Sequence, residues 1–103
     1  MITKQKNKPT TSDYKEFLTK RLRNPGVAAG YLNAALEQGE ATFLLAIKDV
    51  AEAKGGIGPL AKKSHLNREG LYEILSENGN PRFSSLSRAL DALDMKLTPE
   101  LLT

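Results

Sequence analysis

The sequence predicts an all-α protein, a bundle of five to six helices in a single domain. Apolar residues recur at spacings of three and four along most of the 103-residue chain, which is the pattern of half-buried helices. No stretch alternates apolar and polar residues over four or more positions, as a half-buried strand would. Glycine, proline and asparagine divide the periodic segments into short units. A chain of this length supports one modest core.

The first helix is expected over residues 13–22. Asp13 can cap it, with Glu16 three residues later in the arrangement of a capping box. Its apolar face is formed by Tyr14, Phe17, Leu18 and Leu22. Asn24-Pro25-Gly26 then ends the helix, because proline disfavours helical geometry at the residue before it.

Two longer helices are expected over residues 27–38 and 41–54. The first has two adjacent apolar stripes at i, i+4 spacing: Val27, Tyr31 and Ala35, and Ala28, Leu32 and Leu36. Gly39 is suited to end it. The second is expected to bury Phe43, Leu44, Ile47, Val50 and Ala51 and to present Lys48, Asp49 and Glu52 to water. Gly55-Gly56 follows as its end.

Three shorter helices complete the predicted bundle. Residues 58–64 suit a short helix with Pro59 in its first turn. After a tight turn, Asn67 is placed to cap a helix that runs to about residue 76. Residues 77–82 have the composition of a loop. A last helix over residues 84–94 is expected to bury Leu86, Ala89, Leu90 and Leu93, and Pro99 can start another helical turn beyond it.

Residues 57–76 match the requirements of a helix-turn-helix, in which two short helices meet across a turn of three or four residues. Ala61 supplies the small residue where the second helix crosses the first, and Leu66 fills the turn. Leu71 and Ile74 have the i, i+3 spacing that points both inward. His65 occupies the turn position where glycine is usual, and histidine tolerates the left-handed conformation better than most residues.

Double-stranded DNA is the ligand that this motif predicts. The major groove accepts a helix, and arginine reads the acceptor edge of guanine. Arg68 is the residue we expect to make that contact, with Asn67, Glu69 and Tyr72 on the same exposed stripe. Asn67 also serves as the helix cap. Lys62, Lys63 and Arg82 are candidates for contacts with phosphate groups.

The positive charge of the chain is unevenly distributed. Residues 1–24 contain seven basic and two acidic residues, whereas the rest contains eight basic and ten acidic ones. We expect residues 1–11 to form a disordered basic arm and residues 12–103 to form the helical domain. Such an arm can follow phosphates or an acidic partner, or simply be a solvated tail. Residues 57–83 carry a net charge of only +1, so a homodimer that reads two half-sites is expected.

Several other function classes find little support in the residues. The chain has no cysteine and one histidine, so neither a disulfide framework nor a zinc centre is expected, and we predict no cofactor. An enzyme is disfavoured, since there is no nucleophile–base pair and Gly55-Gly56-Ile57-Gly58 lacks the rest of a P-loop. The longest apolar run, residues 43–47, is far shorter than a membrane span, and no apolar segment follows the N-terminal lysines, so we expect a cytoplasmic protein.

Five segments, in order and spacing, resemble one known family. They are Tyr31-Leu32-Asn33-Ala34-Ala35-Leu36, Val50-Ala51-Glu52-Ala53-Lys54-Gly55, Leu60-Ala61, Leu66-Asn67-Arg68-Glu69-Gly70-Leu71-Tyr72 and Gly79-Asn80-Pro81-Arg82-Phe83. The family is that of the probable addiction-module antidote proteins, antitoxins with a phage-repressor-like helix-turn-helix of the Xre type. The chain departs from its pattern at His65, where glycine is usual, and at Gly70, where alanine is more common.

The resemblance implies a bacterial type II antitoxin that neutralises a RelE/ParE-type toxin and represses the promoter the two genes share. The toxin-binding half of this expectation depends on the resemblance alone. A stand-alone prophage-type regulator without a toxin is the alternative, and a small adaptor that binds only protein is a third possibility. An adjacent open reading frame for a small protein favours the first.

Overall fold

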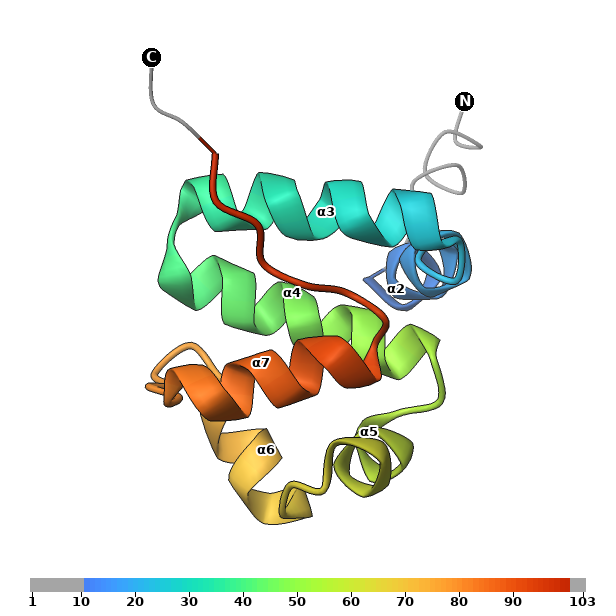
Figure 1. The fold of residues 1–103 in the computed structure, drawn as a ribbon. Helices are drawn as coiled ribbons and strands as arrows, with labels where there is room; N and C mark the ends of the chain where they lie inside the picture. The colour runs from blue at the N-terminus through green and yellow to red at the C-terminus, as the bar shows by residue number, and fades with distance from the viewer. Residues whose placement is uncertain (1–10, 101–103) are drawn as a thin grey trace, which may run out of the picture.

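The computed structural model describes residues 11–100 of the chain, and these residues form helices without any strand (Figure 1). The helices are α2 (Thr11–Arg21), α3 (Pro25–Gln38), α4 (Glu40–Ala53), α5 (Ile57–Ser64), α6 (Arg68–Ile74) and α7 (Phe83–Ala92). The predicted all-α fold class, with six helices in the described part, is therefore confirmed. No described helix has the length and apolar character needed to span a membrane.

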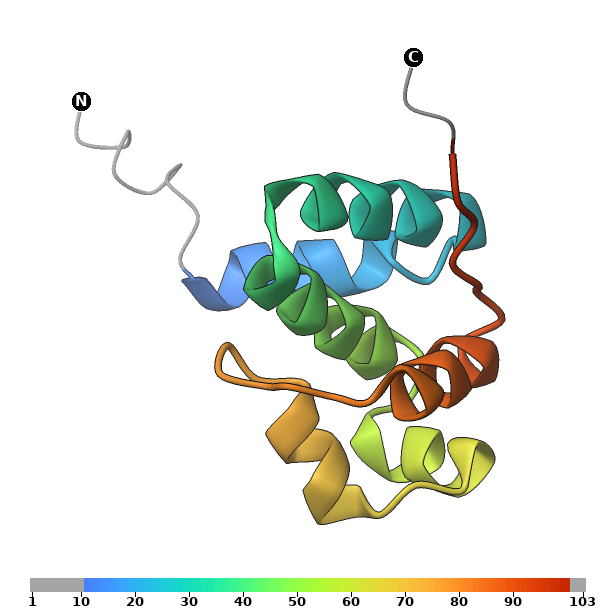
Figure 2. The same cartoon turned by 60° about the vertical axis from the view of Figure 1, so that its left-hand side comes forward.

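Helices α3 and α4 form an antiparallel hairpin on which the other helices are built (Figures 1 and 2). Helix α2 packs against α4, α4 contacts α5, and α5 contacts both α6 and α7. The core lies between these helices, and its largest fully buried side chains are Leu22, Leu44, Ile47, Val50, Leu71 and Leu75. Helix α4 supplies seven buried residues, including all five that the sequence predicted to be buried. It is therefore the central helix of the domain.

Local capping explains where α3 begins and ends. The side-chain oxygen of Asn24 accepts hydrogen bonds from the backbone nitrogens of Gly26 (2.9 Å) and Val27 (3.2 Å). Pro25 occupies the first turn, where its missing N–H costs nothing. The helix thus begins two residues before the predicted Val27. At its other end Gly39 adopts a φ of 126° and ends α3 as predicted. It is the single residue between α3 and α4, because α4 begins at Glu40, one residue earlier than predicted.

Helix α2 differs from its prediction at the N-terminal end. Asp13 lies inside the first turn, and Thr11 already belongs to the helix, so Asp13 is not the cap. Residues 1–10, which hold the rest of the predicted basic arm, lie outside the described residues. Leu22 is buried and Leu18 partly buried, whereas Tyr14 and Phe17 are each 58% exposed. Only half of the predicted apolar face therefore contributes to the core.

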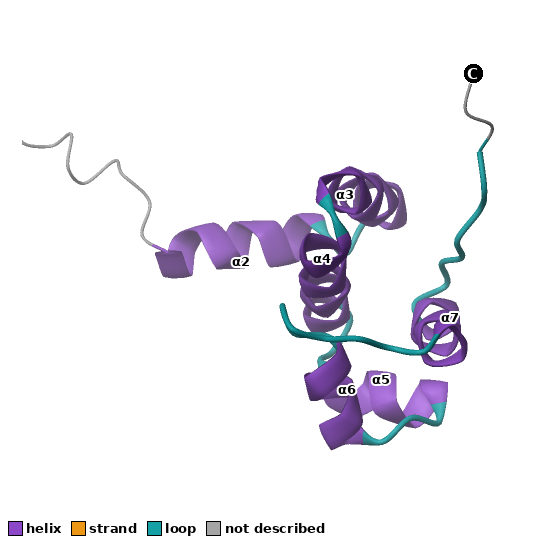
Figure 3. Cartoon of the chain, turned by 90° about the vertical axis from the view of Figure 1, so that its left-hand side faces the viewer, coloured by secondary structure: helices purple, strands orange, loops and turns teal. Residues whose placement is uncertain are grey.

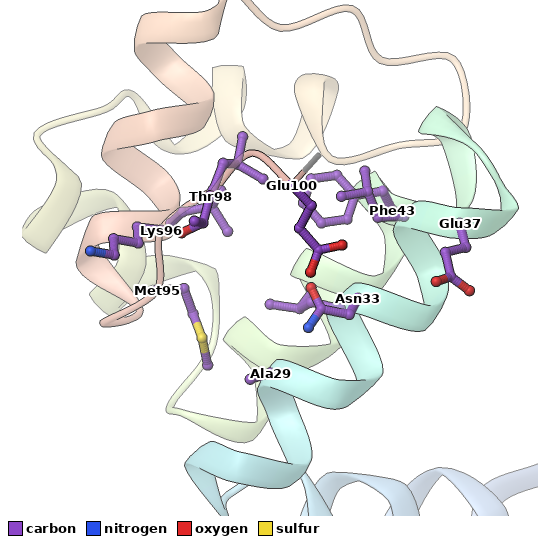
Figure 4. Close-up of a pocket in the computed structure, with 12 residues that line it drawn as sticks. Ala29, Asn33, Glu37, Phe43, Met95, Lys96, Thr98 and Glu100 are labelled. Atoms are coloured by element: carbon purple, nitrogen blue, oxygen red, sulfur yellow. The ribbon is translucent and has the colours of Figure 1, made fainter. Parts of the chain in front are cut away.

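The chain after α7 runs back across the domain without helical structure as far as residue 100. Helix α7 ends at Ala92, two residues earlier than predicted, because Asp94 takes a φ of 62°. Pro99 and Glu100 are not helical, and the rest of the helical turn predicted to start at Pro99 lies outside the described residues. Residues 95–100 face α3 across a groove of about 580 Å³, whose walls mix apolar side chains with Asn33, Glu37, Lys96 and Glu100 (Figure 4). The groove is thus not a continuous apolar surface.

Candidate nucleic-acid interface

Helices α5 and α6, with the turn of residues 65–67 between them, form the predicted helix-turn-helix. Ala61 is buried where the two helices pack, and Leu71 is completely buried. Leu66 and Ile74 are only partly buried. The second fully buried residue of this region is Leu75, directly after α6. Leu75 was not among the residues predicted to be buried, although its position four residues after Leu71 is the spacing of a shared helix face.

The turn has the left-handed backbone that the sequence predicted. His65 adopts φ 60° and ψ 34°, and the backbone nitrogen of Leu66 donates to the carbonyl oxygen of Ala61 (3.1 Å). The buried hydroxyl of Ser64 donates to the carbonyl oxygen of Leu60 (2.7 Å). The polar groups at the end of α5 are therefore bonded within the chain, and the turn is tightly defined.

A side chain from α7 holds the same turn from outside the motif. The Nε of Arg88 donates to the carbonyl oxygen of Ser64 (3.2 Å), and its Nη2 donates to that of His65 (2.8 Å). A guanidinium group can make two such bonds in a fixed geometry. Arg88 was not predicted as part of the site, because nothing in its local pattern shows that it contacts residues 23 and 24 positions earlier.

Asn67 caps α6 as predicted. Its Oδ1 accepts a hydrogen bond from the backbone nitrogen of Gly70 (2.9 Å), and its backbone is extended. A methyl group on Gly70 would meet only Asn67, at 3.7 Å, which is an ordinary contact. The structure therefore gives no steric reason for glycine at position 70 within this chain.

The exposed stripe of α6 carries the side chains that were expected to read bases. Arg68, Glu69 and Tyr72 are all exposed, the last with 47% of its surface. The ammonium group of Lys48, on α4, lies 5.8 Å from the centre of the Tyr72 ring. This distance is within the range of a cation–π contact. Lys48, which was expected merely to face water, is partly buried and supports Tyr72.

The three candidate phosphate contacts come from other elements. Lys62 and Lys63 are exposed in the last turn of α5. Arg82 is exposed at the N-cap position of α7, where its side chain makes no capping bond. The structure thus brings Asn67, Arg68, Glu69 and Tyr72 together on α6 and its cap, and places the three basic residues on the elements before and after it.

The described residues offer few candidate metal ligands or titratable groups with a shifted pKa. They contain no group of three or more histidine, cysteine or acidic side chains that could hold a metal ion. His65 is exposed and serves as the turn residue. Tyr31, away from the motif, has a shifted pKa: burial, and next its hydrogen bond to Asp49 (2.5 Å), raise the pKa of its hydroxyl well above the usual range.

Comparisons with known proteins find one family and one relative that the chain resembles in sequence. A family model described as "Probable addiction module antidote protein" matches residues 13–100. An uncharacterised protein from Haemophilus influenzae (strain ATCC 51907 / DSM 11121 / KW20 / Rd) is 34% identical over 67 residues, which cover 64% of this chain and 68% of the relative. No solved structure matches the chain.

Proposed function

Because the chain belongs to the probable addiction module antidote protein family, we propose that it neutralises a RelE/ParE-type toxin and represses its own operon by binding operator DNA. Family membership supports the antidote role, and with it a toxin partner and a regulatory rather than an enzymatic activity. The repressor role is supported by one observation above all: α6 carries Arg68, Glu69 and Tyr72 exposed on a helix fixed at its cap and at the preceding turn.

Sequence reading requires side chains that reach base edges in the major groove. Arg68 is in the first turn of α6 and is exposed, so its guanidinium can approach the N7 and O6 acceptors of a guanine. Asn67 uses Oδ1 for the cap, which leaves its amide nitrogen to donate to a base or a phosphate. Glu69 can accept from cytosine, and Tyr72 can contact a base or the backbone.

The basic residues on either side of α6 in the chain would position the protein along the DNA by contacting phosphate groups. Lys62, Lys63 and Arg82 supply positive charge on both sides of the reading helix in the chain, and contacts to phosphate position a protein without specifying sequence. Because the net charge of residues 57–83 is only +1, one unit would bind DNA weakly. A homodimer with half-sites about one helical turn (~34 Å) apart is therefore part of the proposal.

The toxin must contact surfaces outside the reading helix if one molecule performs both roles. Helices α2 and α3 are at the opposite end of the domain from α5 and α6 (Figure 1), which makes them the candidates for partner contacts. The toxin class, RelE/ParE, follows from the family resemblance rather than from any residue of this chain. Because operator DNA and a toxin encoded beside it are both found in the bacterial cytoplasm, a cytoplasmic location is part of the proposal.

Co-expression with the product of the neighbouring open reading frame tests the antitoxin role. We expect the neighbour alone to arrest growth, co-expression to restore it, and the two proteins to co-purify. A harmless neighbour that forms no complex would reject neutralisation and would leave a plain DNA-binding regulator.

Arg68→Ala tests the repressor role on the promoter fragment of the same operon. The loss of a base contact should cost about 1–3 kcal/mol at the operator and reduce discrimination at one base position. Lys96→Ala, which removes a positive charge from an exposed residue after α7, is the control and should bind like the wild type. Equal weakening of Arg68→Ala on every DNA sequence would place Arg68 among the phosphate contacts. Absence of binding by the wild type would reject the repressor role.

A further inference from the structure

Helix α2 stands away from the body of the domain. Figure 3 shows its N-terminal part extending sideways from the α3–α4 hairpin. Its inner side is held by Leu18, Leu22 and an ion pair between the Nζ of Lys15 and the carboxylate of Glu52 on α4 (3.5 Å). The opposite side of α2 is therefore directed away from the core.

That outer side carries an acidic, an aromatic and a basic residue in sequence. Asp13, Phe17 and Arg21 follow one another at i, i+4 and i+8, so they lie on one face of the helix. Phe17 is 58% exposed, and Asp13 and Arg21 are exposed as well. The guanidinium carbon of Arg21 lies 5.8 Å from the centre of the Phe17 ring, so the basic and aromatic members of this stripe lie side by side.

We propose that this outer stripe pairs with the same stripe of a second copy, antiparallel, with Phe17 on the two-fold axis. Position 17 then faces position 17, and Asp13 of each copy faces Arg21 of the other. A two-fold interface must be self-complementary in this way, because the same surface serves both partners. The apolar ring lies at the centre and two opposite-charge pairs lie at the rim, as in stable interfaces. Antiparallel pairing also sets the two helix dipoles in opposite directions.

A second copy is the partner whose chemistry the chain itself specifies. A toxin on α2 would need an aromatic-binding surface with a particular order of charges, whereas the second copy supplies that order through α2 itself. The pairing is argued from α2 alone. Only its biological role, which is to present two α6 helices to DNA, rests on the proposed function. In Figure 3, α5 and α6 lie to one side of the line along which α2 extends. Let the two-fold axis pass through Phe17 and run parallel to the direction from α2 towards α6. Rotation about this axis does not change height along it, so both α6 helices lie on the same side of the dimer.

A charge exchange between the two rim positions tests the pairing without DNA or toxin. The mass of the purified full chain is measured by light scattering and sedimentation over a dilution series. Asp13→Arg and Arg21→Asp each place like charges together twice per dimer, so each should raise the dimer dissociation constant about tenfold to a hundredfold. The double variant restores opposite charges and should return the constant to within about threefold of wild type.

Phe17→Ala tests the apolar centre of the interface, and Phe83→Ala is its matched control. Both remove an exposed phenyl ring, and Phe83 at the start of α7 is the more exposed of the two, at 71%. Phe17→Ala should weaken the dimer about tenfold or more, whereas Phe83→Ala should leave its dissociation constant unchanged. Circular dichroism of each variant verifies that α2 remains helical.

Four outcomes would overturn the proposal. They are a monomeric wild type, single variants that dimerise normally, a folded double variant that does not recover, and dissociation by Phe83→Ala instead of Phe17→Ala. Variants that keep the dimer but no longer bind the toxin would assign the stripe to the toxin. Because the four outcomes are read from the dimer dissociation constant of the purified chain, without DNA or toxin, they are independent of the growth and operator tests above.

Discussion

Gly79, in the turn after α6, is the position where the structure makes the sharpest prediction. Its backbone nitrogen donates to the carbonyl oxygen of Ser76 (2.9 Å), which folds the chain back against the end of α6. A Cβ atom at Gly79 would lie 2.1 Å from the carbonyl oxygen of Ile74 and 2.7 Å from its carbonyl carbon. Ordinary contacts of this kind lie at about 3.5 Å or more. The methyl group would therefore overlap backbone atoms by more than an ångström.

Gly79→Ala should accordingly lower the free energy of unfolding by about 3 kcal/mol, because the overlap is with backbone and only displacement of the turn can relieve it. Gly79 is not among the positive-φ glycines, so the contact alone carries this expectation. Urea unfolding followed by circular dichroism measures the effect as a lower midpoint at unchanged m.

Gly30→Ala provides the matched control. Gly30 is exposed within α3, and a Cβ there meets nothing within 4 Å. The same methyl addition should stabilise the protein by about 1 kcal/mol, since alanine is the better helix former. The two substitutions thus have opposite predicted signs. A loss below about 0.5 kcal/mol for Gly79→Ala, within the range of ordinary surface substitutions, would refute the reasoning.

Three further substitutions test the turn and the hairpin. Arg88→Ala removes both bonds to the turn carbonyls and should destabilise the protein by about 1–3 kcal/mol in thermal unfolding; an unchanged Tm would contradict this. His65→Gly relieves a left-handed backbone and should raise unfolding free energy in urea by about 0.5–1 kcal/mol, so a decrease would count against strain there. Tyr31→Phe loses the bond to Asp49 and should cost about 1–2 kcal/mol at neutral pH. Because the pKa of Tyr31 is raised on folding, its stabilisation is complete below the unfolded pKa of about 10 and declines as pH rises above it. The difference in urea midpoint between wild type and Tyr31→Phe should therefore narrow in alkali, and a constant difference would contradict the cause given for the shift.

Most of the fold could be predicted because its boundaries are set by neighbouring residues. Asn67 caps α6 through a hydrogen bond that spans three residues, and Gly39 ends α3 through its own backbone conformation. Asn24 caps α3 in an equally local way, although the pattern there was interpreted only as the end of the preceding helix. These signals are complete within a few positions of sequence. The left-handed conformation of His65 was likewise predictable, because the motif demands it and histidine tolerates it.

The contacts that other helices make with α6 and the turn before it could not be predicted. Arg88 reaches a turn more than twenty residues away, and the ammonium group of Lys48 lies over the ring of Tyr72 from a different helix. Both residues look like ordinary exposed charges in their own helices. Tyr14 and Phe17 were predicted to lie on the apolar face of α2 but are exposed. The cause is related, because periodicity indicates an apolar face but not how much of that face other helices cover.

The two hydrogen bonds from Arg88 to the turn have a consequence for attempts to transfer the proposed DNA recognition from one member of the family to another. The outward residues of α6 are exposed, so they can be exchanged without disturbing the core. If α6 reads DNA as proposed, such exchanges would change the preferred base sequence. The segment of residues 57–76 is not a detachable cassette, because the carbonyl groups of Ser64 and His65 depend on a donor in α7. A chimaera that inherits the turn without a guanidinium at position 88 would carry the proposed base-contacting residues on a helix whose preceding turn lacks these two hydrogen bonds.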